Sequence, residues 1–224
     1  MDFEGIIFDV DGTLVDSNDA HAHAFVEAFG SLGYAAPFEH VRRLIGKGSD
    51  KLIPELIGRY DAAVAERKKA IFKERHLPRL RSFPGVEELL QYLTDVGMRL
   101  AVASSAAGDE LEALLEVAHA KRYFDATTGA DDGGRSKPDP DTVQAALRKL
   151  GLPPQRCVLV GDTPYDAQAA EDAGVGFIGV RCGGFWGDED LQPALGVEDD
   201  PAALLRYFTR TAAPRAAPGG HHVI

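Results

Sequence analysis

The sequence predicts an α/β protein in which a doubly wound parallel sheet carries an α-helical domain inserted after its first strand. One observation is that short apolar runs alternate with helix-length segments between residues 83 and 180, as in successive strand–helix units. Another is that about sixty-five residues of helical pattern follow the first apolar run, whereas such connections usually have ~2–6 residues. A third is that three apolar runs end in polar groups, as expected where strand ends form a site.

The first predicted strand is the apolar run at residues 6–8, which stops at Asp9, Asp11, Gly12 and Thr13. Residues two apart on an extended chain point the same way, so Asp9 and Asp11 leave the strand facing one site. Two carboxylates that close raise one pKa unless a cation neutralises them, and hard oxygen ligands suit Mg²⁺. Gly12 permits a sharp turn, and Thr13 offers a hydroxyl and an amide to an anion.

The inserted segment, residues 16–81, is predicted to form a helical cap domain. Its first helix spans residues 18–33, because Asn18 or Asp19 caps an apolar stripe at helical spacing and a glycine follows it. Two glycines interrupt the pattern within residues 44–50, which predicts a mobile loop there. Further helices are expected from residue 52 and, with many charged residues, over residues 62–77.

The remaining chain, residues 1–15 and 82–210, is predicted to be a sheet core, followed by a flexible tail at residues 211–224. Helix-capping residues, prolines and glycines indicate where its strands and helices begin and end. The further strands are expected at residues 100–103, 126–128, 157–160 and 176–180, and the helices at residues 86–96, 109–119, 140–150, 164–173 and 201–209.

Composition narrows the class of protein. The chain has 224 residues, of which 45% are hydrophobic, enough to bury a substantial core. No stretch approaches the ~18–20 apolar residues that span a bilayer, and no signal segment opens the sequence, so we expect a cytoplasmic protein. The net charge of −11 argues against nucleic acid or an anionic membrane as the partner, since both require a basic face. A monomer or homodimer acting on a small molecule is expected.

Polar residues at three strand ends predict the site. Asp9 and Asp11 follow the first strand, Ser104 follows the second and Asp162 follows a later one. Taken singly, Ser104 is also explained as an ordinary strand-end hydroxyl and Asp162 as a helix cap. In an open parallel sheet the carboxyl ends meet where the winding reverses, so these groups are expected to assemble one site at that point.

Four motifs in this order resemble the haloacid dehalogenase superfamily of phosphotransferases. They are Asp9-Val10-Asp11-Gly12-Thr13, then Ser104 after an apolar strand, then Lys137 within Ser136-Lys137-Pro138-Asp139-Pro140, and finally Gly161-Asp162-Thr163-Pro164-Tyr165-Asp166. Thr163 stands where serine is more usual. The resemblance extends to about residue 209 and includes the small helical cap after the first strand, which is similar to the phosphoglycolate phosphatase and β-phosphoglucomutase branch. It implies a Rossmann-like core.

The resemblance implies a Mg²⁺-dependent phosphatase that hydrolyses a small phosphorylated metabolite, phosphoglycolate-like or a sugar phosphate. Asp9 would attack phosphorus and give an aspartyl-phosphate, and Asp11 would act as acid on the leaving oxygen and then as base towards water. Mg²⁺ would sit between the Asp9 carboxylate, the Asp11 backbone carbonyl and Asp162.

The same resemblance implies which groups surround the phosphate. Thr13, Ser104, Ser105 and Lys137 would hold the phosphoryl oxygens, with Lys137 supplying positive charge in a water-poor site. Asp166, one helical turn beyond Asp162, would orient Lys137 or a metal-bound water.

Substrate choice is assigned to the cap, through Arg43, Gly46, Lys47 and His21. The loop around Gly46 would hang over the core site, and Arg43 or Lys47 would pair with a carboxylate or second phosphate on the substrate. The alternative is that both are solvated helix-end cations. His21 is equally well explained as a partly exposed histidine on a helix face.

Three other functions stay open on the sequence. Sugar-phosphate mutases of this superfamily share a histidine like His21, but usually carry Glu-Asp where this chain has Gly161-Asp162. Phosphonate hydrolases need an imine-forming lysine at the position of Ser49. A phosphate-binding module without catalysis is the third, because fold alone does not fix function.

Overall fold

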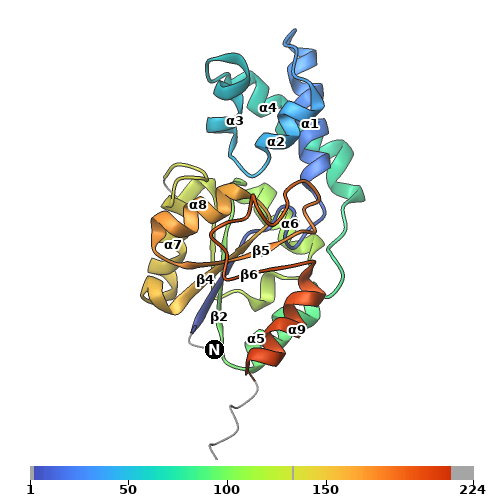
Figure 1. Ribbon diagram of the computed structural model, residues 1–224. Coiled ribbons are helices and arrows are strands. Elements are labelled where there is room, and N and C mark those ends of the chain that lie inside the picture. Colours follow the sequence, from blue (N-terminus) through green and yellow to red (C-terminus); the bar gives the residue numbers. More distant parts are fainter. Residues whose placement is uncertain (1–2, 133, 213–224) are drawn as a thin grey trace, which may run out of the picture.

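In the computed structural model, which describes residues 3–132 and 134–212, the core is a six-stranded sheet of parallel neighbours (Figure 1). The chain runs from β1 out to β3 and then returns to the other side of β1, giving the order β3-β2-β1-β4-β5-β6. This is the predicted doubly wound α/β fold, confirmed. The strands are β1 Gly5–Phe8, β2 Arg99–Ala103, β3 Ala126–Thr128, β4 Cys157–Gly161, β5 Gly176–Val180 and β6 Gly196–Glu198.

Alternate residues of β1 pack into two different apolar clusters, because successive side chains of a strand point to opposite faces. Ile6 and Phe8 lie in the cluster that contains apolar residues of α5 (Val86–Asp95), α6 (Gly108–Val117) and α9 (Pro201–Ala212). Ile7 lies in the cluster formed with α7 (Asp141–Leu150) and α8 (Pro164–Ala173). The sheet is therefore buried on both faces, as all-parallel sheets require.

The inserted helices form a separate layer above the carboxyl ends of the strands (Figure 1). They are α1 (Asn18–Ser31), α2 (Phe38–Leu44), α3 (Ser49–Ile57) and α4 (Ala62–Ile71), and we call this layer the cap. The helix predicted over residues 62–77 is α-helical only to Ile71, after which the chain continues as a π turn and a 3-10 turn to Arg79. The pattern of charged residues in this segment did not indicate that the α-helix would change to a π turn and a 3-10 turn.

Two features of the carboxyl-terminal part differ from the prediction. β6 was not predicted, because its three residues are only half-buried and too few to show a periodic pattern. α9 extends to Ala212, so the tail predicted from residue 211 begins inside this helix, and its residues 213–224 lie outside the described ranges.

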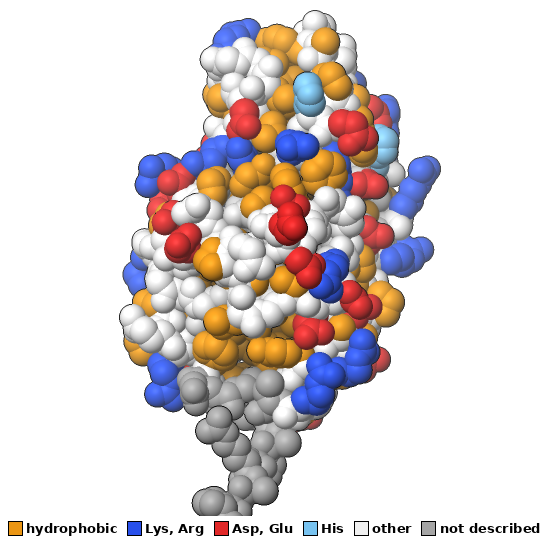
Figure 2. Space-filling view, viewed as in Figure 1, with side chains coloured by type: hydrophobic (Ala, Val, Ile, Leu, Met, Phe, Trp, Pro, Cys, Tyr) orange, Lys and Arg blue, Asp and Glu red, His pale blue; other side chains and the backbone are white. Residues whose placement is uncertain are grey.

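The surface shows acidic and basic side chains interspersed over the face seen in Figure 2. Within the residues described, every helix is too short or too polar to cross a bilayer.

Candidate active site

The register of the sheet brings the predicted strand-end residues level with one another. Phe8 is paired with Val102 of β2 and with Val160 of β4. The residues that follow these strands therefore leave the sheet at the same edge, and the amide of Asp9 donates to the Val160 carbonyl at 2.9 Å. Asp9, Ser104 and Asp162 are all buried there. The structure thus brings the three strand ends together at the point where the winding reverses.

Lys137 connects the nucleophile candidate to a second carboxylate. Its ammonium donates to Asp9 Oδ1, and to Asp166 Oδ1 at 2.6 Å, with all three side chains buried. Burial lowers the pKa of Lys137, but the negative charges of Asp166 and Asp9 outweigh it, so the pKa lies above its ordinary value. Lys137 therefore stays a cation against Asp9.

Asp166 is held by the start of α8. Thr163 is the N-cap residue of this helix. In a capping box, its hydroxyl accepts from the Asp166 amide at 3.3 Å and its amide donates to Asp166 Oδ2 at 3.1 Å. The hydroxyl also lies 2.6 Å from Asp166 Oδ2. The alternative in which Asp162 caps the helix is therefore wrong. The free carboxylate oxygen of Asp166 points to Lys137, as the prediction that Asp166 orients Lys137 requires.

Asp162 is bound by the first residue of the cap. Asn18 Nδ2 donates to Asp162 Oδ2 at 2.8 Å, and the Thr13 hydroxyl lies 3.5 Å from Asp162 Oδ1. Burial raises the pKa of Asp162 to about 7, the nearby charge of Asp166 adds to the rise, and the Asn18 hydrogen bond opposes it. The sequence assigned Asn18 or Asp19 to capping α1, which is wrong: Ser17 is the N-cap residue, and neither side chain is bonded to the helix end.

The carboxylates of Asp9, Asp162 and Asp166 form one buried group. Each offers an oxygen within 4.8 Å of the others. Burial raises the pKa of Asp9, Lys137 opposes this, and the neighbouring carboxylates raise it further. Three buried acidic groups at this spacing repel one another, and Lys137 forms ion pairs only with Asp9 and Asp166 of the three. The hard oxygen donors of the group fit a further cation such as Mg²⁺.

The side chain of Asp11 points away from that group and towards the cap. His21 Nε2 lies 2.8 Å from Asp11 Oδ1, and the Ser17 hydroxyl donates to the same oxygen. Burial opposes ionisation of Asp11, but His21 and Ser17 together lower its pKa to about 2. His21 is itself buried and stacks on Phe72 with ring centroids 3.9 Å apart. The alternative of an exposed histidine on a helix face is therefore wrong.

Of the four predicted phosphate-binding residues, Lys137 contacts Asp9 and only Ser105 lines the open cavity. Ser105 lines it and donates to the Gly46 carbonyl of the cap at 2.9 Å. Thr13, Ser104 and Lys137 are buried beneath, and the Ser104 hydroxyl accepts from the amide of Ala106 at 3.0 Å.

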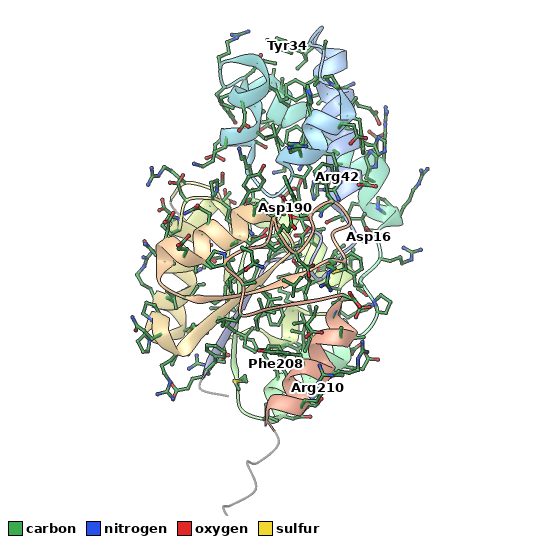
Figure 3. The ribbon with its side chains drawn as sticks, viewed as in Figure 1. Asp16, Tyr34, Arg42, Asp190, Phe208 and Arg210 are labelled. Atoms are coloured by element: carbon green, nitrogen blue, oxygen red, sulfur yellow. The ribbon has the colours of Figure 1, made fainter. Side chains whose placement is uncertain are left out.

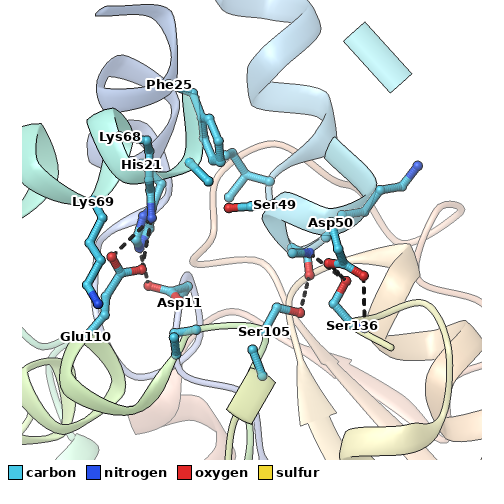
Figure 4. A pocket seen from close by; sticks show the side chains of 18 of the residues that line it. Asp11, His21, Phe25, Ser49, Asp50, Lys68, Lys69, Ser105, Glu110 and Ser136 are labelled. Atoms are coloured by element: carbon cyan, nitrogen blue, oxygen red, sulfur yellow. Dashed lines mark hydrogen bonds and ion pairs between the residues drawn. The ribbon is translucent and has the colours of Figure 1, made fainter. Parts of the chain in front are cut away.

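A cavity of about 480 Å³ lies between the cap and the strand ends, with Asp9 and Asp11 in its wall (Figure 4). His21 of α1 lies on one side of it and Asp50 on the other (Figure 4), and Phe25, Gly48 and Ser49 also line it. Its size suits a small metabolite.

Of the four residues predicted to select substrate, His21, Gly46 and Lys47 line the cavity. The Lys47 ammonium pairs with Glu55 and lies 4.8 Å from the centre of the Tyr165 ring. Arg43 is absent from the cavity wall within the described ranges, because its guanidinium lies over the rings of Phe185 and Trp186, at 5.9 and 5.8 Å.

Arg42, which the sequence did not single out, lies at the junction of cap and core (Figure 3). It is buried, binds Asp19 at 2.6 Å, and donates to the Gly183 carbonyl of the loop after β5. Asn18 also approaches that carbonyl, at 3.4 Å. The start of the cap is therefore tied to the loop that lies against Asp162.

The sequence matches one known protein family over most of its length. Residues 6–180 match the model of the haloacid dehalogenase-like hydrolases. The chain belongs to this family. Members of similar sequence include a probable phosphatase IndB of Dickeya dadantii, 38% identical over 80% of this chain and 81% of that protein. A phosphoglycolate phosphatase of Nitrosospira multiformis is 33% identical over 78% of this chain and 81% of its own length.

Solved structures of this family agree with the fold. A hydrolase from Pseudomonas syringae superposes with a TM-score of 0.86 at 27% identity, covering 94% of this chain and all of that one. CbbY from Rhodobacter sphaeroides, in complex with xylulose-(1,5)bisphosphate, has a TM-score of 0.77 at 29% identity over 90% and 96% of the two chains. The predicted resemblance is confirmed, and this haloacid dehalogenase-like hydrolase is a phosphatase.

The sequence missed a further pair in this phosphatase, Lys68 of α4 and Glu110 of α6. Lys68 lies at helical spacing from the buried Val64 and Ile71, on the apolar side of α4. That position was the available signal, since a lysine within an apolar stripe is a candidate for burial. Its partner is 42 residues away, beyond the reach of any local pattern.

Proposed function

We propose that the chain is a Mg²⁺-dependent phosphatase that hydrolyses a small phosphorylated metabolite through an aspartyl-phosphate on Asp9. The observation that carries this proposal is the separation of the two carboxylates of the first motif. Asp9 binds Lys137 on the core side, and Asp11 binds His21 on the cap side, while both line one cavity. Two carboxylates in such different environments suit two different roles.

In the first step a carboxylate oxygen of Asp9 forms a bond to phosphorus as the bond from phosphorus to the leaving oxygen breaks. Lys137 favours the ionised form of Asp9 against the effect of burial, and it lies where negative charge accumulates on the phosphoryl group. Ser104, Ser105 and Thr13 supply the neighbouring hydroxyls and amides.

The leaving oxygen takes a proton from Asp11. The negative charge of a bound phosphate favours the protonated form of this carboxyl by repulsion, and His21 Nε2, 2.8 Å from Asp11 Oδ1, helps to hold the side chain in place. In the second step Asp11 removes a proton from water, which attacks phosphorus and releases Asp9. Ser17 keeps Asp11 aimed at the cavity throughout.

The residues that would hold Mg²⁺ are Asp9 and Asp162 with the backbone carbonyl of Asp11. When bound, the ion would offset the charge on the phosphate and polarise its oxygens. The spacing and burial of the Asp9 and Asp162 carboxylates support this assignment. Asp166 is already engaged by Lys137 and Thr163, which supports its role in positioning Lys137.

We also propose that residues 16–81 act as a cap domain on a core formed by residues 1–15 and 82–210. Opening would admit substrate and closure would exclude water from Asp9. The contact between Ser105 and Gly46 is one of those that opening would break.

The test follows labelled phosphate from p-nitrophenyl phosphate through a rapid acid quench, with and without Mg²⁺. We expect acid-stable but hydroxylamine-labile label on the wild-type protein, release of inorganic phosphate, and loss of turnover in chelator that Mg²⁺ restores. When a sugar phosphate is added as acceptor, transfer of the label mainly to its hydroxyl would replace the phosphatase by a mutase. Turnover unaffected by chelator would remove the metal from the proposal.

A further inference from the structure

A part-buried ion pair in the cavity wall affects which substrates the cavity admits. Lys68 of α4 donates to both carboxylate oxygens of Glu110, at 2.9 and 3.2 Å, and both residues line the cavity (Figure 4). The Lys68 ammonium also lies 5.4 and 4.9 Å from the ring centres of Phe25 and Phe72. Apolar rings on one side and Glu110 on the other leave Lys68 fully engaged.

The other lysines of the wall are paired as well. Lys69 binds Asp109 at 2.8 Å, and Lys47 binds Glu55. Across the described ranges, each lysine that lines the cavity already has a carboxylate partner. A second anionic group on a substrate would therefore compete with a carboxylate of the protein for each of these lysines.

The cavity wall also carries several carboxylates. Beyond the two catalytic candidates it includes Asp50, Glu66, Glu110 and Asp131. Asp50 accepts from the Ser136 hydroxyl at 2.5 Å. Carboxylates at a cavity wall accept hydrogen bonds from substrate hydroxyls, and such charge-assisted bonds are stronger than neutral ones. The same carboxylates repel a carboxylate or a second phosphate.

We infer that this cavity selects phosphomonoesters whose leaving group is neutral and bears hydroxyls, and rejects those whose leaving group carries a carboxylate or a second phosphate. The inference rests on the phosphatase function proposed above and narrows its substrate class. An anion bound to Lys68 would separate it from Glu110 and leave the part-buried Glu110 without its partner, which is unfavourable. Glu110 is therefore the residue that determines this specificity.

The test compares matched substrates that differ only in a terminal hydroxymethyl group or carboxylate. The pairs are 2-hydroxyethyl phosphate with phosphoglycolate, and glycerol 3-phosphate with 3-phosphoglycerate. We expect kcat/KM to be about 10-fold or more higher for the neutral member of each pair. In Glu110→Gln the ratio should fall by about 10-fold, because the amide removes a charge and frees Lys68 to pair with the substrate carboxylate.

Glu112→Gln is the matched control, since Glu112 lies on the same helix but is exposed and pairs with Lys121 at 3.3 Å. It should keep the wild-type ratio. The inference is overturned if the anionic member of each pair has the higher kcat/KM, or if the two members of each pair have equal kcat/KM. It is also overturned if none of the four compounds is hydrolysed. The same preparation is also assayed with p-nitrophenyl phosphate. If this aryl phosphate is hydrolysed, the proposed phosphatase function stands and only the substrate inference fails. If it is not hydrolysed either, the proposed function itself fails.

Discussion

The core site and the cap use the same kinds of side chain in opposite ways. In the core, the side chains of Lys137, Asp9 and Asp166 are at most 6% exposed. Lys137 forms both ion pairs, one with each aspartate, through its Nζ atom. In the cap, Lys69 is 43% exposed and forms a simple pair with Asp109 of α6, which is 54% exposed. Exposed pairs of this kind contribute ~0–1 kcal/mol, whereas breaking a buried pair costs several.

This difference in burial separates the residues that would carry out the reaction from those that would select the substrate. The buried network fixes the nucleophile and its cation in one geometry, so a change there affects every substrate. The pairs of the cap are individually weak and can be changed without unfolding the core. Lys68 and Glu110 join the same two helices as Lys69 and Asp109, but their side chains are only 9% and 12% exposed, so this pair stands between the two classes.

The largest effect is expected from Asp9→Asn, which tests whether the core pair performs the chemistry. The amide keeps the shape but loses the charge that attacks phosphorus, so kcat should fall by about 10⁴-fold or more, as when a nucleophile is removed. Initial rates on p-nitrophenyl phosphate measure the loss, and circular dichroism checks that the fold is kept. Activity within a few-fold of wild type would exclude Asp9 as the nucleophile.

Lys137→Met should affect both stability and activity. It leaves Asp9 and Asp166 buried beside each other without a cation, so the free energy of unfolding should fall by about 3–5 kcal/mol. Urea denaturation in chelator measures this, with Lys149→Met as control, since Lys149 pairs with Asp132 at the surface. If both variants unfold at the same urea concentration, the buried network does not stabilise the core as argued.

Asn18→Ala sharpens the comparison at the boundary, because Asn18 is a cap residue bonded to the core carboxylate Asp162. Losing this bond frees the Asp162 side chain to rotate, so the affinity for a divalent ion should fall by about 10-fold. Titration with Mn²⁺ followed by electron paramagnetic resonance reports the affinity without relying on turnover.

Asp19→Asn, which instead loses the partner of Arg42, serves as the control for Asn18→Ala and should keep the Mn²⁺ affinity. An unchanged affinity in Asn18→Ala would show that Asp162 is positioned by the core alone.

The smallest effect is expected from Lys47→Ala. The Lys47 ammonium is already paired with the half-exposed Glu55, so its loss should raise KM by less than about 3-fold for neutral and anionic substrates alike. Steady-state kinetics on the four matched compounds measure it. A rise of ~10-fold or more confined to the anionic substrates would return Lys47 to the role that the sequence assigned to it.

The chain's local patterns predicted most of the core and the residues at its strand ends. Asp9 and Asp11 share a direction because side chains of an extended strand alternate, and Asp162 joins them because parallel strands end at one edge of the sheet. These rules depend only on sequence spacing and strand order, so they can be applied to the sequence alone. Where the cues were weak, as for the three residues of β6, the element was missed.

The sequence by itself determined the fold class, the phosphatase motifs and the edge of the sheet where they meet, because each depends on short-range periodicity or on strand order. Only the tertiary structure decided what those groups bind. Asn18 meets Asp162 across 144 residues, and Lys68 meets Glu110 across 42. Contacts of this kind depend on how the cap is seated on the core, which packing over the whole interface sets and no local pattern encodes.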